Sequence, residues 1–183
     1  MAKGKVAFVA HCLLNQNAKV AEFARLPGVV TPIIEKLKER NYVIEQLPCP
    51  EVLAMGLTRW WTTREIYDNP GYRRHCRNLA KFTVDMIEDY YKKGFEIVLV
   101  GLDGSPSSGV RYTGSSDPIW GGRPNATVEQ YKIIPGKGIW IEELEKELNS
   151  RGIPFPKATG IPMDFPDFEM EKAVKEFEEF LGE

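Results

Sequence analysis

The sequence predicts an α/β fold, a three-layer α/β/α sandwich built on a mostly parallel sheet. Two short apolar runs, residues 6–10 and 95–102, are typical of strands that are buried on both faces of such a sheet. Segments with helical periodicity lie between the strands, so that strand and helix alternate along the chain. Three of the strands lead directly into loops that carry a thiol or a hydroxyl.

The first half of the chain contains two strands and two helices. A strand over residues 6–10 precedes a helix over 33–40, for which Pro32 suits the first position. A second strand covers 42–47, and a long helix covers 72–93. Four residues recur in this helix at helical spacing and predict its buried stripe: Leu79, Phe82, Met86 and Tyr90.

The second half begins with the strand at 95–102, followed by a stretch at 103–138 that is rich in Gly, Ser and Pro. A structureless loop of this length is usually functional, so we expect a lid or crevice wall there. The helix that follows, 139–150, buries Ile141, Leu144 and Leu148. Pro154 and Pro156 confine the strand at 153–159 to an edge of the sheet.

A final helix at 167–181 buries Met170, Val174, Phe177 and Leu181. The order of elements is Rossmann-like or flavodoxin-like. We expect one α/β domain over residues 1–183, with the crevice loop at 103–138 as part of it.

Composition excludes several classes of protein. The net charge of −2 argues against a protein that binds duplex nucleic acid over a wide basic face. The apolar runs are too short to cross a membrane, and the one near the N-terminus is too short for a signal peptide, which predicts a cytoplasmic protein. Three cysteines in such a chain indicate metal or redox chemistry, or burial, rather than a disulfide framework.

The candidate site lies where three strands end. Cys12 follows the first strand, Cys49 follows the second, and a serine-rich loop at 104–109 follows the third. If these strands are parallel neighbours, the loops meet at the edge where open α/β sheets bind ligands. Thiolates are the preferred ligands of iron–sulfur clusters and zinc, although a free cysteine is also a common core residue.

Several polar residues near these loops are candidates for chemistry or binding. Glu51 is placed to act as an acid or base, or to favour the start of a helix. Ser105 and Ser107 offer hydroxyls, although no histidine-activated serine motif surrounds them. Arg59 and Arg64 belong to a group of arginines that suits a carboxylate or phosphate as well as a solvated helix face.

Three motifs in order resemble the thiouracil desulfurase (TudS) family. They are Cys12-Leu13-Leu14, then Cys49-Pro50-Glu51-Val52 with Gly56-Leu57, then Ser105-Pro106-Ser107 with Gly109. The variant at residues 11–17 is similar to a TudS-related desulfidase subgroup. The resemblance covers about two-thirds of the chain and implies a [4Fe-4S] cluster held by three cysteines, with one iron open to the sulfur of the substrate. Carried over, the ligands are Cys12, Cys49 and the residue at position 108.

Position 108 departs from this pattern because it is Ser108, where the family has its third cysteine. Three explanations stay open: an engineered residue, Cys76 as the third thiolate, or a different cofactor or none.

The sequence as a whole favours a desulfurase that removes sulfur from a thiolated nucleobase or a similar small thio-compound. In this interpretation Glu51 and Ser105 are catalytic, Asn15, Arg59, Arg64 and Ser107 bind the substrate, and Cys12, Cys49 and Ser108 hold the cluster. The alternative is a non-catalytic small-ligand-binding or sensor domain that has lost the cluster with the third cysteine. Weaker hypotheses are a hydrolase using Ser105 or Ser107, and zinc held by Cys12, Cys49 and a histidine.

Overall fold

Four parallel strands form the central sheet in the order β2-β1-β3-β6. Their bounds in the computed structural model, which describes residues 4–116 and 131–182, are β1 Lys5–Ala10, β2 Tyr42–Leu47, β3 Glu96–Leu102 and β6 Lys157–Ile161. The first three strands lie side by side, as the sequence predicts, so their carboxyl ends share one edge.

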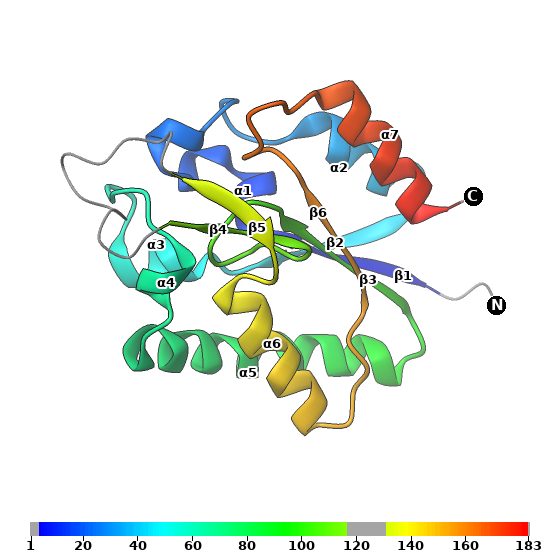
Figure 1. Cartoon of the computed structure of the whole chain (residues 1–183). Coiled ribbons are helices and arrows are strands. Elements are labelled where there is room, and N and C mark those ends of the chain that lie inside the picture. Colours follow the sequence, from blue (N-terminus) through cyan, green and yellow to red (C-terminus); the bar gives the residue numbers. More distant parts are fainter. Residues whose placement is uncertain (1–3, 117–130, 183) are drawn as a thin grey trace.

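Helices cover both faces of this sheet. Figure 1 shows α2 (Thr31–Glu39) and α7 (Met170–Leu181) on one face, and α5 (Pro70–Lys92) and α6 (Ile139–Ser150) on the other. Successive side chains of β1 point to opposite faces and therefore belong to two separate cores. Ala7 belongs to the core with α2 and α7, whereas Phe8 belongs to the core with α5 and α6. The predicted three-layer α/β/α sandwich is confirmed.

Short elements gather at the carboxyl ends of the strands, on the left of Figure 1. They are the helices α1 (His11–Leu14), α3 (Pro50–Met55) and α4 (Arg64–Tyr67) and the 3-10 turns η1 (Gln16–Ala18) and η2 (Ala21–Phe23). None of the helices in the described part of the chain is long and apolar enough to cross a membrane.

The stretch at 103–138 contains regular structure, which corrects the expectation of a structureless loop. Strands β4 (Tyr112–Ser115) and β5 (Lys132–Pro135) form an antiparallel pair with Thr113 opposite Ile134. Each strand is only four residues long, so its pattern was hidden among glycines, serines and prolines. Residues 117–130 of the predicted crevice wall lie outside the described residues.

The buried face of α5 also differs from the prediction. Phe82 is 72% exposed and Met86 is 40% exposed, while Leu79 and Tyr90 are only partly buried. The buried residues are Tyr72, Cys76, Ala80, Thr83, Val84 and Ile87. Leu79 and Tyr90 pack at the margin of this face, which also includes small residues such as Ala80, so a pattern that counts only bulky side chains places the stripe partly off the buried side.

The predictions for the last three elements are mostly confirmed. In α6, Ile141, Leu144 and Leu148 are buried. Phe177 and Leu181 of α7 are buried, whereas Met170 and Val174 are only partly so. The last strand is at an edge, as expected, but β6 begins at Lys157 and ends at Ile161. It starts after Pro154 and Pro156 because proline cannot donate to the ladder.

Candidate functional site

Three loops meet in one pocket at the carboxyl edge of the sheet. Cys12 lies in α1 directly after β1, Cys49 precedes α3 as its N-cap, and Ser108 lies in the loop after β3. All three line the same pocket, together with Glu51 and Arg59. The predicted meeting of these loops is therefore confirmed.

Tight backbone contacts hold the serine loop in place. The Ser108 carbonyl accepts from the Leu102 amide at 3.0 Å, which folds the loop back onto β3. The Ser107 carbonyl accepts from the Trp140 amide at 3.1 Å, which joins the loop to the start of α6. A Cβ at Gly138 would lie 2.3 Å from the Ser107 carbonyl oxygen, so a side chain there would displace the loop.

Hydroxyls and a carboxylate form one corner of the pocket. The Ser107 hydroxyl donates to Glu51 Oε1 at 2.6 Å. Ser105 Oγ accepts from the Ser108 amide at 3.1 Å and lies 3.3 Å from Ser107 Oγ. Because Ser105, Ser107 and Ser108 are all at least nine-tenths buried, this hydrogen-bonded chain is shielded from bulk water.

Arg59 balances the charge of Glu51. Its Nη2 lies 3.2 Å from Glu51 Oε2, and the arginine side chain is only 4% exposed. The same guanidinium donates to the carbonyls of Ala18 at 2.8 Å and Gly56 at 3.3 Å. Arg59 thus ties three segments of the pocket wall together while it keeps the carboxylate paired.

The pKa values of both thiols in the pocket are raised, which favours their protonated forms. Burial raises the pKa of Cys12 well above its usual value, with the charges of Cys49, Asp164 and Glu51 acting in the same direction and Lys19 opposing them. Burial, followed by the charge of Glu51, raises the pKa of Cys49 to about 11. Since the thiolate is the metal ligand, a bound cationic group has to displace both protons.

The donor set can be compared with an iron–sulfur cluster. Such clusters are held mainly by cysteine thiolates, and this pocket presents two thiols and the Ser108 hydroxyl. Two sulfur donors and one oxygen donor are chemically able to act as ligands of such a cluster. Cys76 does not line this pocket but lies on α5, where it is fully buried in the core that α5 and α6 share with the sheet.

The histidines do not line the pocket either. A ring nitrogen of His11 lies 2.9 Å from Gln46, and His75 Nε2 lies 3.0 Å from the Pro50 carbonyl oxygen. Within residues 4–116 and 131–182, no group of three or more His, Cys, Asp or Glu side chains is placed to hold a metal ion. A zinc site made by two thiols and a histidine is therefore not assembled here.

Two predicted substrate-binding residues lie away from the pocket lining. The Asn15 side chain accepts from the Asn17 amide at 3.1 Å and caps η1. Arg64 forms an ion pair with Glu142 at 2.6 Å and also donates to the Lys137 carbonyl. Both side chains thus have local structural partners, in contrast to Arg59 and Ser107, which line the pocket.

A buried ion pair that sequence reasoning missed lies in the same pocket. Lys19 Nζ pairs with Asp164 Oδ1, and both side chains are only 5% exposed. Burial raises the pKa of Asp164, while Lys19 acts in the opposite direction. The sequence contained a signal for Asp164, because this residue follows the fourth strand at the edge where the other loops end. The predicted strand ended at residue 159, before β6 does, so Asp164 was not recognised as a residue of that edge.

Aromatic rings form another wall. The Tyr131 ring contacts both Phe23, at 4.9 Å between ring centroids, and Trp61, at 5.7 Å. The Tyr131 hydroxyl donates to the Gly104 carbonyl at 2.6 Å, which holds the ring against the serine loop. The cavity that these walls border is about 40 Å³, whereas sites for small molecules ordinarily span about 300–1,000 Å³.

The fold and the site define an α/β protein with a thiol-lined pocket at the carboxyl edge of its parallel sheet. Residues 5–138 match the family described as "Putative 2-thiouracil desulfurase". The chain is also 31% identical over 180 residues to the uncharacterized protein MJ0003 of Methanocaldococcus jannaschii, covering 98% of this chain and 99% of that protein. It belongs to this desulfurase family, which confirms the resemblance seen in the sequence motifs.

A solved structure, described as a [4Fe-4S]-dependent thiouracil desulfidase TudS, is also similar to this chain. The TM-score is 0.45 and the sequence identity is 19%, over 86% of this chain and 91% of that one.

Proposed function

We propose that this protein is a desulfurase that removes sulfur from a thiolated nucleobase or a similar small thio-compound at an iron–sulfur cluster. The observation that carries the proposal is the placement of Cys12, Cys49 and Ser108 in one pocket with Glu51, in a chain of the desulfurase family. In the net reaction a C=S bond is replaced by a C=O bond, with water supplying the oxygen and the sulfur leaving as hydrogen sulfide. No electrons are exchanged.

Cys12, Cys49 and Ser108 are the residues that would hold a [4Fe-4S] cluster. When bound, the cluster supplies a Lewis-acidic iron for the soft sulfur of the substrate. The two thiols have raised pKa values, so binding of a cationic group would be coupled to release of their protons.

Protons are handled at the hydroxyl–carboxylate corner. Glu51 Oε1 already accepts a hydrogen bond from Ser107 Oγ, and the Ser105 hydroxyl lies next to that bond. We assign Glu51 to take a proton from the attacking water and Ser105 to relay or position that water. Ser107 holds the carboxylate toward the pocket, and Arg59 keeps its charge balanced.

Anaerobic reconstitution with iron and sulfide tests the proposal. Wild-type protein, C12S and C49S are compared with S108C, and C76S is the matched control because Cys76 lies outside the pocket. We expect wild-type protein and C76S to bind similar amounts of iron and sulfide. S108C should bind more, since a third thiolate replaces a hydroxyl, and C12S and C49S should bind little.

Turnover provides the second readout. Reconstituted wild-type protein or S108C should convert 2-thiouracil to uracil with release of one sulfide, and E51Q should do so much more slowly. If wild-type protein and S108C both stay colourless and hold no iron or sulfide after reconstitution, the proposal is wrong.

The Ser108 hydroxyl favours one second candidate, a small-ligand-binding or sensor domain that has lost the cluster. That function requires a heterocycle to bind to metal-free protein and 2-thiouracil to remain unchanged. Native mass spectrometry of the purified chain, with and without the ligand, separates the two.

A further inference from the structure

The Lys19–Asp164 pair has no role in the chemistry described above, although it lines the same pocket as the thiols. Lys19 ends the η1 turn, and Asp164 lies in the turn that follows β6. Burying two charges has a desolvation cost that their attraction often only offsets, so such a pair is weak evidence for stability. Its place in the pocket that the thiols line indicates a role in binding a ligand.

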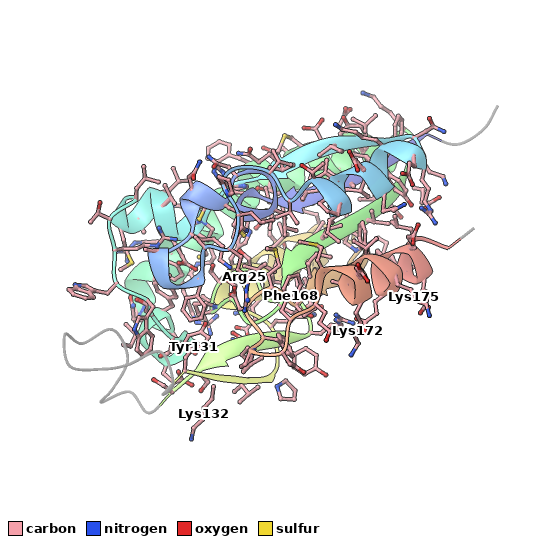
Figure 2. The ribbon with its side chains drawn as sticks, turned by 90° about the horizontal axis from the view of Figure 1, so that it is seen from above. Arg25, Tyr131, Lys132, Phe168, Lys172 and Lys175 are labelled. Carbon is pink, nitrogen blue, oxygen red and sulfur yellow. The ribbon has the colours of Figure 1, made fainter. Side chains whose placement is uncertain are left out.

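The Arg25 side chain holds the backbone of the turn that carries this carboxylate. Arg25 donates to the carbonyls on either side of Asp164, through Nε to Met163 at 2.6 Å and through Nη2 to Phe165 at 2.9 Å. The Arg25 guanidinium also lies 5.4 Å from the centre of the Phe168 ring, beside which Figure 2 shows it. Arg25 therefore holds the turn on both sides of Asp164 in the sequence.

A second contact fixes the pair relative to the thiols. The Gln16 side chain donates to the Cys12 carbonyl at 2.8 Å and accepts from the Arg25 amide at 3.3 Å. Gly104 has φ +93°, and a Cβ there would lie 2.7 Å from the Asp164 Cβ. Glycine therefore both makes the turn and lets Asp164 approach the serine loop.

The pair has hydrogen-bonding capacity beyond the bond that joins it. That bond uses one of three ammonium protons of Lys19 and one oxygen of Asp164. An ammonium group has three donors and a carboxylate about four acceptor positions. Side by side, they present a donor next to an acceptor, which matches a ring that carries a C=O group next to an N–H group.

We infer that Lys19 and Asp164 select heterocyclic lactams by pairing with the N–H and C=O groups on one ring edge. Asp164 accepts from the ring N–H, and Lys19 donates to the neighbouring carbonyl oxygen. The aromatic wall of Phe23, Trp61 and Tyr131 receives the ring itself. This inference rests on the proposed function, and it narrows the substrate class to thiolated rings with a free N–H beside a carbonyl. Thio-compounds whose ring nitrogens are alkylated are rejected.

The test measures binding rather than turnover. Isothermal titration calorimetry compares uracil, which has both groups, with 1,3-dimethyluracil, which has the carbonyls but no N–H. Full-length protein is used both before and after anaerobic reconstitution. The variants are K19M and D164N, and the matched controls are K36M and E178Q, which break an ion pair between α2 and α7 outside the pocket.

Wild-type protein and both controls should bind uracil on the order of tenfold to a hundredfold more tightly than 1,3-dimethyluracil, the range expected for one charge-assisted hydrogen bond. K19M and D164N should lose a similar factor in uracil affinity, and D164N should no longer distinguish the two ligands. Each single variant leaves one buried charge unpaired, so the double variant K19M/D164N, which leaves none, is measured as well. It should fold with a near-native circular dichroism spectrum and also fail to distinguish the ligands.

Two results overturn the inference: wild-type protein that does not prefer uracil, or a D164N or double variant that keeps the wild-type preference. Neither affects the proposed function, because conversion of 2-thiouracil by the reconstituted protein is measured separately. Conversely, the protein could prefer uracil through this pair and yet never release sulfide from 2-thiouracil. That result supports the inference and contradicts the proposed desulfurase function.

Discussion

Glu51 and Arg59 provide a quantitative test of how the pocket is held together. In E51Q the guanidinium of Arg59, whose side chain is 4% exposed, loses the carboxylate that lies 3.2 Å away. Removing one partner of a buried ion pair costs about 3–5 kcal/mol. We expect about 3 kcal/mol, the lower end of that range, because Arg59 keeps the carbonyls of Ala18 and Gly56.

The assay is urea unfolding of metal-free protein followed by circular dichroism, with thermal unfolding as a second measure. For a chain of this size, about 3 kcal/mol corresponds to a fall in Tm of about 6–12 °C. The double variant E51Q/R59M removes both charges and should recover most of the loss, to within about 1 kcal/mol of wild type. D89N breaks an exposed pair on α5 and should leave the unfolding midpoint nearly unchanged.

Two outcomes would refute this reasoning. A loss below about 1 kcal/mol in E51Q would mean that Arg59 is solvated or finds a new partner. A double variant as unstable as E51Q would mean that the carboxylate acts through Ser107 rather than through the ion pair.

Two further predictions concern the α5–α6 side of the molecule. The pKa of Glu143 is lowered overall. Burial acts to raise this pKa, but the bonds to Lys146 and Arg73 outweigh burial. The stability that Glu143 contributes is therefore present above its unfolded pKa, 4.5, and is lost as pH falls through the lower folded value. The difference in unfolding free energy between wild type and E143Q should narrow from pH 6 to pH 3, and a constant difference would contradict the assignment. On α5, A80L should destabilise the protein by about 1–3 kcal/mol because position 80 is fully buried. F82S should change the unfolding midpoint little. If F82S destabilised the protein more than A80L does, the buried stripe of α5 would be the one that the sequence predicts.

Local patterns were enough to predict the layers and the edge of the sheet that carries the pocket. The apolar runs of β1 and β3 identify strands buried on both faces, and parallel strands place Cys12, Cys49 and the serine loop at one edge. The order of these motifs also indicated the family to which the chain belongs. Each of these features depends on short stretches of sequence.

Only the tertiary structure decided which side chains meet across the fold. The buried face of α5 includes Ala80, which no count of bulky residues could select, since α6 and the sheet determine which side is covered. Lys19 and Asp164 are 145 positions apart and pair because β6 brings the turn after it to the end of β3. The separation of Cys76 from the pocket likewise follows from the packing of a whole helix. Periodicity reports how one segment is buried, whereas a contact between distant segments exists only once the chain has folded.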